Sequence, residues 1–107
     1  MKQGDIVLIE FPFADLGEKK LRPALVISNA RYNKFSNILL VGIYSREQPC
    51  SLRLTQDELS SGEINHDSFV SLQNVFSADK SLLRPRAIAA LTSKKTKEVC
   101  KELQKYL

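Results

Sequence analysis

The chain has 107 residues, 43% of them hydrophobic, which predicts one domain over residues 1–107 with one core. Two cysteines and a single histidine are too few for a disulfide framework, a two-histidine acid–base pair or a histidine-rich metal site. The net charge is +4, but residues 92–107 alone carry five lysines against two glutamates, so the charge does not by itself indicate a nucleic-acid partner. No stretch approaches the roughly 18 consecutive apolar residues of a membrane span. Acids at Asp5 and Glu10 argue against a signal peptide, so we expect a cytoplasmic protein with no membrane partner.

The first half of the chain predicts three strands separated by polar segments. Residues 5–11 ("DIVLIEF") are apolar and β-branched and stop at a proline, which predicts a strand. Residues 12–22 predict a loop. Residues 23–28 predict a second strand, because proline is tolerated as the first residue of a strand. After a polar connection over residues 29–37, the most apolar run, residues 38–45, predicts a central strand.

The second half predicts shorter strands and a terminal helix. The short strands are expected over residues 50–54, 67–72 and 86–91. Residues 55–62 predict a single helical turn that begins with a capping box. Val99, Leu103 and Leu107 recur at helical spacing, which predicts an amphipathic helix from about residue 93. Five or six strands followed by one helix indicate a small β-barrel with a packed C-terminal helix.

Three separated segments resemble one protein family. Residues 4–28 contain a Gly-Asp strand, a polar loop and an Arg-Pro-Ala strand; residues 38–45 end in a hydroxyl residue; and residues 62–83 contain an Asp-Ser pair that opens a strand. In this order and spacing they resemble the PemK/MazF toxins of bacterial type II toxin–antitoxin systems. The resemblance implies a mainly β fold with α: an SH3-like barrel of five to seven short strands with a C-terminal helix, usually a homodimer.

The resemblance also implies an activity. Such toxins are sequence-specific endoribonucleases that cleave single-stranded RNA (mRNA) without a metal or other cofactor, and a cognate antitoxin protein holds them in check. The implied chemistry is attack by a ribose 2′-hydroxyl on the adjacent phosphate, which leaves a cyclic phosphate and a free 5′-hydroxyl. For this chain, catalysis is expected to rest on arginine, lysine, carboxylate or hydroxyl side chains.

Arg22 matches the arginine of the family's Arg-Pro motif. A planar guanidinium can donate two hydrogen bonds to the negative charge that builds on the phosphate during cleavage. We therefore expect Arg22 to stabilise the transition state electrostatically. The alternative is an arginine at a strand entrance that pairs with a nearby carboxylate such as Glu18.

The second catalytic position departs from the family pattern. Many members carry threonine at the end of the central strand, where this chain reads Ile43-Tyr44-Ser45. Without a gap, Tyr44 takes the threonine position and Ser45 follows it. Either hydroxyl could donate a hydrogen bond to a phosphate. Neighbouring strand residues point to opposite faces, so Ser45 would need a bulge or the end of the strand to reach the site.

Polar residues on both sides of these positions are candidates for RNA binding. They are Glu18, Lys19, Lys20, Arg46, Gln48 and Arg53. Glu18 is also a candidate base for the 2′-hydroxyl if its pKa is raised. The alternative for Glu18, Lys19 and Lys20 is a solvated loop. The alternative for Arg46, Gln48 and Arg53 is a surface that faces the antitoxin or the second copy of a dimer. His66 and Asp67 are interpreted as turn and cap residues without a catalytic role.

Two functions of different class fit the sequence. The first is a toxin endoribonuclease with Arg22 and a nearby hydroxyl at the reacting phosphate. The second is a catalytically inactive barrel that binds a partner and derives from such a toxin, because small barrels of this kind often bind without chemistry. The Arg-Pro entrance and the basic loop favour the first, and the Ile43-Tyr44-Ser45 stretch favours the second.

Overall fold

A computed structural model describes residues 1–11 and 20–107 of the chain. The strands are β1 (Asp5–Phe11), β2 (Lys20–Val26), β3 (Asn37–Tyr44), β4 (Ser51–Leu54), β5 (Leu59–Gly62), β6 (Ser68–Asp79) and β7 (Ala89–Leu91). One α-helix, α1 (Ser93–Gln104), follows them, and short 3-10 helices span Tyr32–Lys34, Gln56–Glu58 and Lys80–Leu82. Among the described residues, therefore, a helix follows seven short strands.

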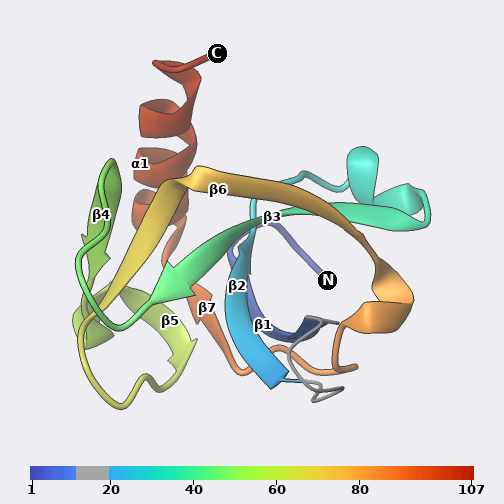
Figure 1. Ribbon diagram of the computed structural model, residues 1–107, viewed down its shortest axis with the longest axis horizontal. Helices are drawn as coiled ribbons and strands as arrows, with labels where there is room; N and C mark the ends of the chain where they lie inside the picture. The colour runs from blue at the N-terminus through green and yellow to red at the C-terminus, as the bar shows by residue number, and fades with distance from the viewer. Residues whose placement is uncertain (12–19) are drawn as a thin grey trace.

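The strands form one antiparallel sheet in the order β4-β6-β3-β2-β1-β7-β5. Figure 1 shows that the sheet is strongly curled, with β6 and β3 arching over β2 and β1, and that α1 stands beside β4 and β6. The curled half-barrel with a C-terminal helix confirms the predicted fold class. No helix of the described part of the chain is both long and apolar enough to cross a membrane.

Alternation along the strands gives the sheet a separate apolar cluster on each face. One cluster includes Val7, Ala24 and Leu40. The other includes Leu25 and Val41 and also takes in Val99 from α1. The helix therefore packs against one face through Val99 and Leu103. Leu107, the third residue of the predicted spacing, lies beyond the end of α1 and is 93% exposed.

Several element bounds differ from the sequence-based expectations. Strand β2 begins at Lys20, so Pro23 lies inside it and not at its start. Proline is tolerated there because β2 pairs with β3 only from Ala24 onward, which leaves β1 as the sole partner of Pro23. The predicted helical turn is a 3-10 helix with the expected capping box, but it gives way at Leu59 to a strand that the sequence did not predict.

Strand β6 extends seven residues past its predicted end at residue 72. Its pairing with β3 jumps from Val41↔Val75 to Ile43↔Val70, so five residues of β6 advance against two of β3. The extra residues form a local irregularity of the kind that bends a strand and redirects its side chains. Asn74 lies within this irregular stretch.

A buried lysine fastens α1 to the sheet. Lys95 is only 5% exposed, and its ammonium donates a 2.8 Å hydrogen bond to the Arg53 carbonyl. The ammonium also forms ion pairs of 3.1 Å with Glu58 and 3.0 Å with Glu98. A buried charge is costly unless it is paired and hydrogen-bonded, and here both conditions hold.

Candidate functional site

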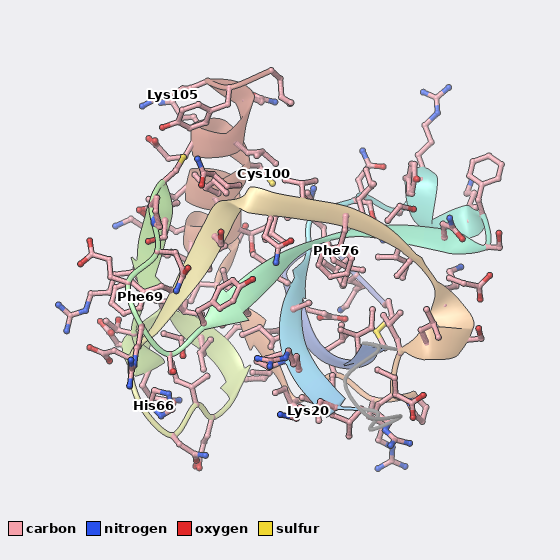
Figure 2. The ribbon with its side chains drawn as sticks, in the orientation of Figure 1. Lys20, His66, Phe69, Phe76, Cys100 and Lys105 are labelled. Atoms are coloured by element: carbon pink, nitrogen blue, oxygen red, sulfur yellow. The ribbon has the colours of Figure 1, made fainter. Side chains whose placement is uncertain are left out.

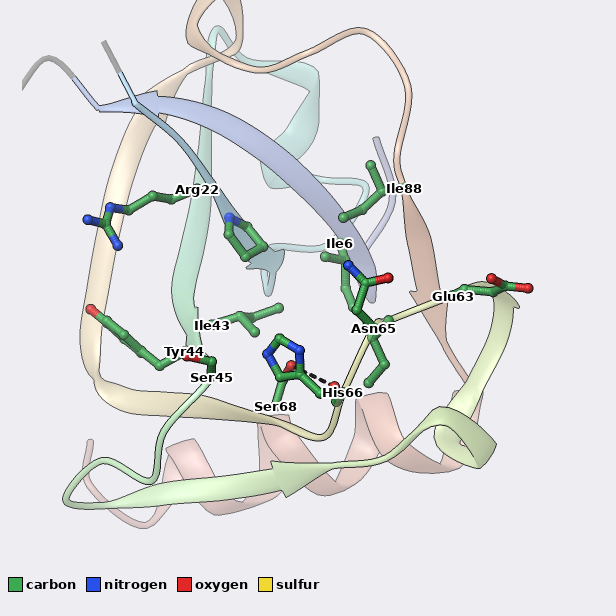
Figure 3. Close-up of a pocket in the computed structure, with 12 residues that line it drawn as sticks. Ile6, Arg22, Ile43, Tyr44, Ser45, Glu63, Asn65, His66, Ser68 and Ile88 are labelled. Atoms are coloured by element: carbon green, nitrogen blue, oxygen red, sulfur yellow. Dashed lines mark hydrogen bonds between the residues drawn. The ribbon is translucent and has the colours of Figure 1, made fainter. Parts of the chain in front are cut away.

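A pocket of about 370 Å³ opens where β2 begins and β3 ends (Figure 3). Its lining combines the Arg-Pro pair, the end of the central strand, and the loop that leads into β6. The lining residues are Ile6, Arg22, Pro23, Ile43, Tyr44, Ser45, Glu63, Ile64, Asn65, His66, Ser68 and Ile88. The pocket therefore brings together Arg22, Tyr44 and Ser45, the three catalytic candidates that the sequence singled out.

Sheet register explains why Arg22 and Tyr44 meet. Ala24 pairs with Gly42 at the end of the β2–β3 ladder, and Arg22 and Tyr44 each lie two residues beyond that pair on their own strands. Side chains two positions apart on a strand share a face, so both project from the same face. In Figure 3 the guanidinium and the phenol extend to the same side of the pocket. Within residues 1–11 and 20–107 no carboxylate pairs with Arg22.

The Tyr44 hydroxyl has a defined partner. The side-chain amide of Asn74 donates a hydrogen bond of 2.6 Å to it. The tyrosine ring also lies along its own strand above Gly42, where an added Cβ would come within 3.0 Å of the ring and 2.6 Å of the amide nitrogen. Gly42 thus provides the space in which Tyr44 and Asn74 contact each other.

Ser45 reaches the pocket because the strand stops. Strand β3 ends at Tyr44, so Ser45 is the first residue after it and is not held to the alternation of a strand. Both residues line the pocket, with Ser45 exposed and Tyr44 half-buried. The end of the strand, which was one of the two conditions for Ser45 to reach the site, is therefore present at this position.

The expected RNA-binding residues are more scattered than the three catalytic candidates, and the described ones do not line the pocket. Lys20 is exposed at the start of β2, and Glu18 and Lys19 fall outside the described residues. Arg46 and Gln48 lie beyond Ser45, outside the pocket lining, and the Gln48 amide donates to the Arg46 carbonyl.

Arg53 also lies outside the pocket lining and forms an ion pair with Asp67. The hydrogen bond to Asp67 and its negative charge raise the pKa of the Arg53 guanidinium. This pair holds the chain just after His66, so its visible role is to fix the loop that leads into β6.

The sequence interpretation missed the loop over residues 63–67. His66 was expected to be a turn residue without chemistry, yet its imidazole lies in the pocket with Asn65 and Ser45 (Figure 3). The available signal was its position directly before the Asp-Ser pair, where the chain enters β6. Local sequence gave no indication that this loop folds back toward Ile88. Among the described residues no three His, Cys, Asp or Glu side chains gather as they would around a metal ion.

Proteins of similar sequence and similar structure are known. The sequence model of the family described as PemK-like, MazF-like toxins of type II toxin–antitoxin systems matches residues 2–107. The MazE-MazF structure (Form-II) from Deinococcus radiodurans is 25% identical with a TM-score of 0.72, over 99% of this chain and 93% of that one. The Mycobacterium tuberculosis toxin MazF-mt6 is 18% identical with a TM-score of 0.70, over 92% of this chain and 90% of that one.

A further solved structure is an endoribonuclease in complex with its cognate antitoxin from a mycobacterial species. It is 18% identical with a TM-score of 0.68, over 96% of this chain and 89% of that one. A search of curated proteins by sequence gives no match. Because the family model spans nearly the whole sequence, the chain belongs to the PemK-like, MazF-like toxins of type II toxin–antitoxin systems.

Proposed function

We propose that this toxin is a metal-independent endoribonuclease that cleaves single-stranded RNA, mRNA in the cell, at specific sequences. The observation that carries the proposal is the meeting of Arg22 with Tyr44 and Ser45 in one pocket. An exposed guanidinium without a carboxylate partner among the described residues is available to an anionic ligand. Hydroxyl donors beside it suit a phosphate that gains charge during reaction.

In the proposed reaction the ribose 2′-oxygen forms a bond to the adjacent phosphorus and releases its proton to solvent. The bond from phosphorus to the 5′-oxygen breaks, and that oxygen leaves with a proton from a pocket hydroxyl, which solvent then restores. Arg22 donates to the non-bridging oxygens, where charge increases in the pentacoordinate transition state. The products are a 2′,3′-cyclic phosphate and a 5′-hydroxyl.

Tyr44 is the better placed of the two candidate proton donors. Its oxygen accepts the hydrogen bond from Asn74, so its own O–H remains free to donate. Ser45 has a shorter reach and no recorded side-chain hydrogen bond among the described residues. We therefore assign proton transfer to Tyr44 and a hydrogen bond to the phosphate to Ser45.

The proposal includes the partners of the reaction. Lys20 precedes Arg22 by two residues and Arg46 follows Ser45, and we propose that both contact RNA phosphates. The wider set of proposed RNA-contacting residues is Glu18, Lys19, Gln48 and Arg53. A cognate antitoxin would cover Arg22 or displace the segment before it, and two copies of the chain would form a homodimer in the cytoplasm.

The test is to identify the ends that the purified protein leaves on a long single-stranded RNA. A cyclic phosphate and a 5′-hydroxyl are expected, with activity falling further in Tyr44→Phe than in Ser45→Ala. A 5′-phosphate product would contradict attack by the 2′-hydroxyl. Absence of cleavage across several RNAs, with antitoxin binding retained, would favour the inactive binding protein.

A further inference from the structure

The loop between β2 and β3 carries aromatic and basic side chains far from the pocket. It contains the run Arg31-Tyr32-Asn33-Lys34-Phe35, directly before the start of β3. Figure 2 shows this loop and the labelled His66 of the pocket on opposite sides of the molecule. Because each strand residue advances about 3.3 Å, the eight residues of β3 separate the loop from the pocket by about 25 Å along the strand.

Two aromatic rings of this loop border an open hollow. Phe35 is 68% exposed although its ring is large and apolar. Together with the half-buried Tyr32 and with Leu39 and Ile27, it lines a hollow of about 440 Å³. A single exposed apolar side chain is ordinary on a protein surface, but a hollow lined by two aromatic rings presents flat faces to a ligand.

The charge of this part of the chain is of one sign. Residues 19–46 contain six basic side chains and no acidic one. Arg31 and Lys34 are exposed, and within the described part of the chain neither takes part in an ion pair. No acidic side chain is found among the described residues that line the hollow. The loop therefore presents uncompensated positive charge beside its rings, which favours an anionic ligand.

Hydrogen bonds hold the loop in place. The buried Ser28 hydroxyl donates to the Asn33 side chain and accepts a 3.1 Å hydrogen bond from the Leu39 backbone. The Asn33 amide in turn donates to the Ser28 carbonyl at 3.0 Å. From the other side, the Lys80 ammonium donates to the Asn33 carbonyl. A loop that is fixed before its ligand arrives lowers the entropy cost of binding.

We propose that Arg31, Tyr32, Lys34 and Phe35 form a stacking platform, a second surface that binds single-stranded RNA outside the pocket. The inference rests on the proposed function, because that function supplies the RNA. Proteins that bind single strands without sequence preference combine aromatic side chains, on which bases stack, with cations that contact the backbone. Tyr32 and Phe35 supply the flat faces here, and Arg31 and Lys34 supply the charges.

The platform gives the toxin a preference for long RNA. An RNA that occupies the pocket and also reaches the platform makes two linked contacts, and the second contact forms at a high effective concentration. A trinucleotide in the pocket cannot reach the far end of β3 and gains nothing from the platform. Phe35→Ala should therefore raise KM for a long RNA, with kcat unchanged, and leave KM for a trinucleotide as it is.

The direct test is binding of a fluorescent 2′-O-methyl oligouridylate, long enough to span both surfaces. Its 2′-oxygens are blocked, so the proposed cleavage cannot consume it. Phe35→Ala should weaken binding about tenfold, the loss of roughly one stacked base. Tyr106→Ala removes a ring of similar exposure, 64%, beyond the end of α1 and should leave binding unchanged. Equal affinities of Phe35→Ala and the wild type would overturn the platform.

The salt dependence of binding tests the charged part of the platform. Each phosphate contact on a single strand contributes about 0.7 to the slope of log affinity against log salt, so Arg31→Gln with Lys34→Gln should reduce that slope by about 1.4. Lys97→Gln with Lys101→Gln removes the same charge from exposed sites on α1 and should leave the slope unchanged. Equal slopes for the two double variants would refute specific contacts at the loop.

The exposed ring has one competing explanation, a contact with a second copy of the chain. Sedimentation velocity should give the same oligomeric state for Phe35→Ala and the wild type. A changed state would assign the hollow to that second copy and overturn the platform.

The platform and the nuclease can fail separately. If the protein binds the blocked RNA through Phe35 but cleaves no RNA, the platform stands and the proposed nuclease fails. If it cleaves RNA and Phe35→Ala binds the blocked RNA as tightly as the wild type, the nuclease stands and the platform fails.

Discussion

The side-chain amide of Asn74 donates a hydrogen bond of 2.6 Å to the hydroxyl of Tyr44, and the two residues come from different strands. The bond consumes an acceptor position of the phenol oxygen and leaves its proton available. It also holds the Tyr44 ring on one face of the sheet, the same face from which Arg22 projects in the neighbouring strand β2. Asn74 is therefore expected to act on catalysis through Tyr44 and not by touching RNA.

Asn74→Ala should lower kcat about tenfold, the effect of losing roughly one hydrogen bond's worth of positioning energy. The exposed neighbour Gln73, changed to alanine, is the matched control and should leave kcat unchanged. In a Tyr44→Phe background the Asn74 change should have little further effect, because the hydroxyl it positions is gone. Additive losses in the double variant would contradict the positioning role.

Replacement of Gly42 should reduce cleavage activity more than it reduces the stability of the fold. An alanine Cβ there would meet the Asn74 amide at 2.6 Å and the Tyr44 ring at 3.0 Å, both of them side-chain atoms that can move. We expect Gly42→Ala to keep a similar free energy of unfolding in urea and to lose cleavage activity because Tyr44 is displaced. A loss of stability with normal kcat in the folded fraction would show that Gly42 serves the fold alone.

Lys95 should contribute strongly to stability through its buried contacts. Lys95→Met leaves the Arg53 carbonyl without its donor and separates Glu58 and Glu98 from their partner. We expect a loss of about 1–3 kcal/mol in the free energy of unfolding. The exposed Lys97 of the same helix, changed to methionine, should alter it by less than about 0.5 kcal/mol. Similar effects of the two changes would contradict the account.

Glu58 links this cluster to pH. Partial burial opposes its ionisation, but the Thr55 backbone hydrogen bond and the Lys95 ammonium outweigh that effect and hold the pKa of this carboxyl below its usual value. Its contribution to stability is therefore complete above the unfolded-state pKa and is lost as the pH falls through the lower folded-state pKa. Glu58→Gln should flatten the acid side of the stability profile in urea titrations, and an unchanged slope there would contradict this linkage.

Features that depend on local pattern were predictable from the sequence. The spacing of Val99 and Leu103 predicted the face of α1 that packs against the sheet. The Arg-Pro motif made Arg22 a catalytic candidate through the family resemblance, and its role stays a prediction. Comparison with the threonine position of the family made Tyr44 and Ser45 candidates, and their catalytic role stays a prediction. Their meeting in one pocket depends on the pairing of β2 with β3, which local pattern does not determine.

Features that depend on distant contacts were not predictable. Asn74 reaches Tyr44 because β6 gains residues against β3, and no residue type in that stretch signals the irregularity. Strand β5 contains two serines and gains its order from pairing with β7, about 30 residues further along the chain. The loop with His66 is fixed by Gln56 and Arg53, whose side chains gave no such signal in sequence.

Cleavage of a long single-stranded RNA in EDTA, by the wild-type protein and by Arg22→Ala, tests the central claim most directly. Lys97→Ala removes the same charge from an exposed site outside the pocket and serves as the matched control. The account predicts that the wild type and Lys97→Ala cleave in the chelator, and that Arg22→Ala is folded but at least about 100-fold slower. Full activity in Arg22→Ala, or loss of wild-type cleavage on chelation, would contradict it.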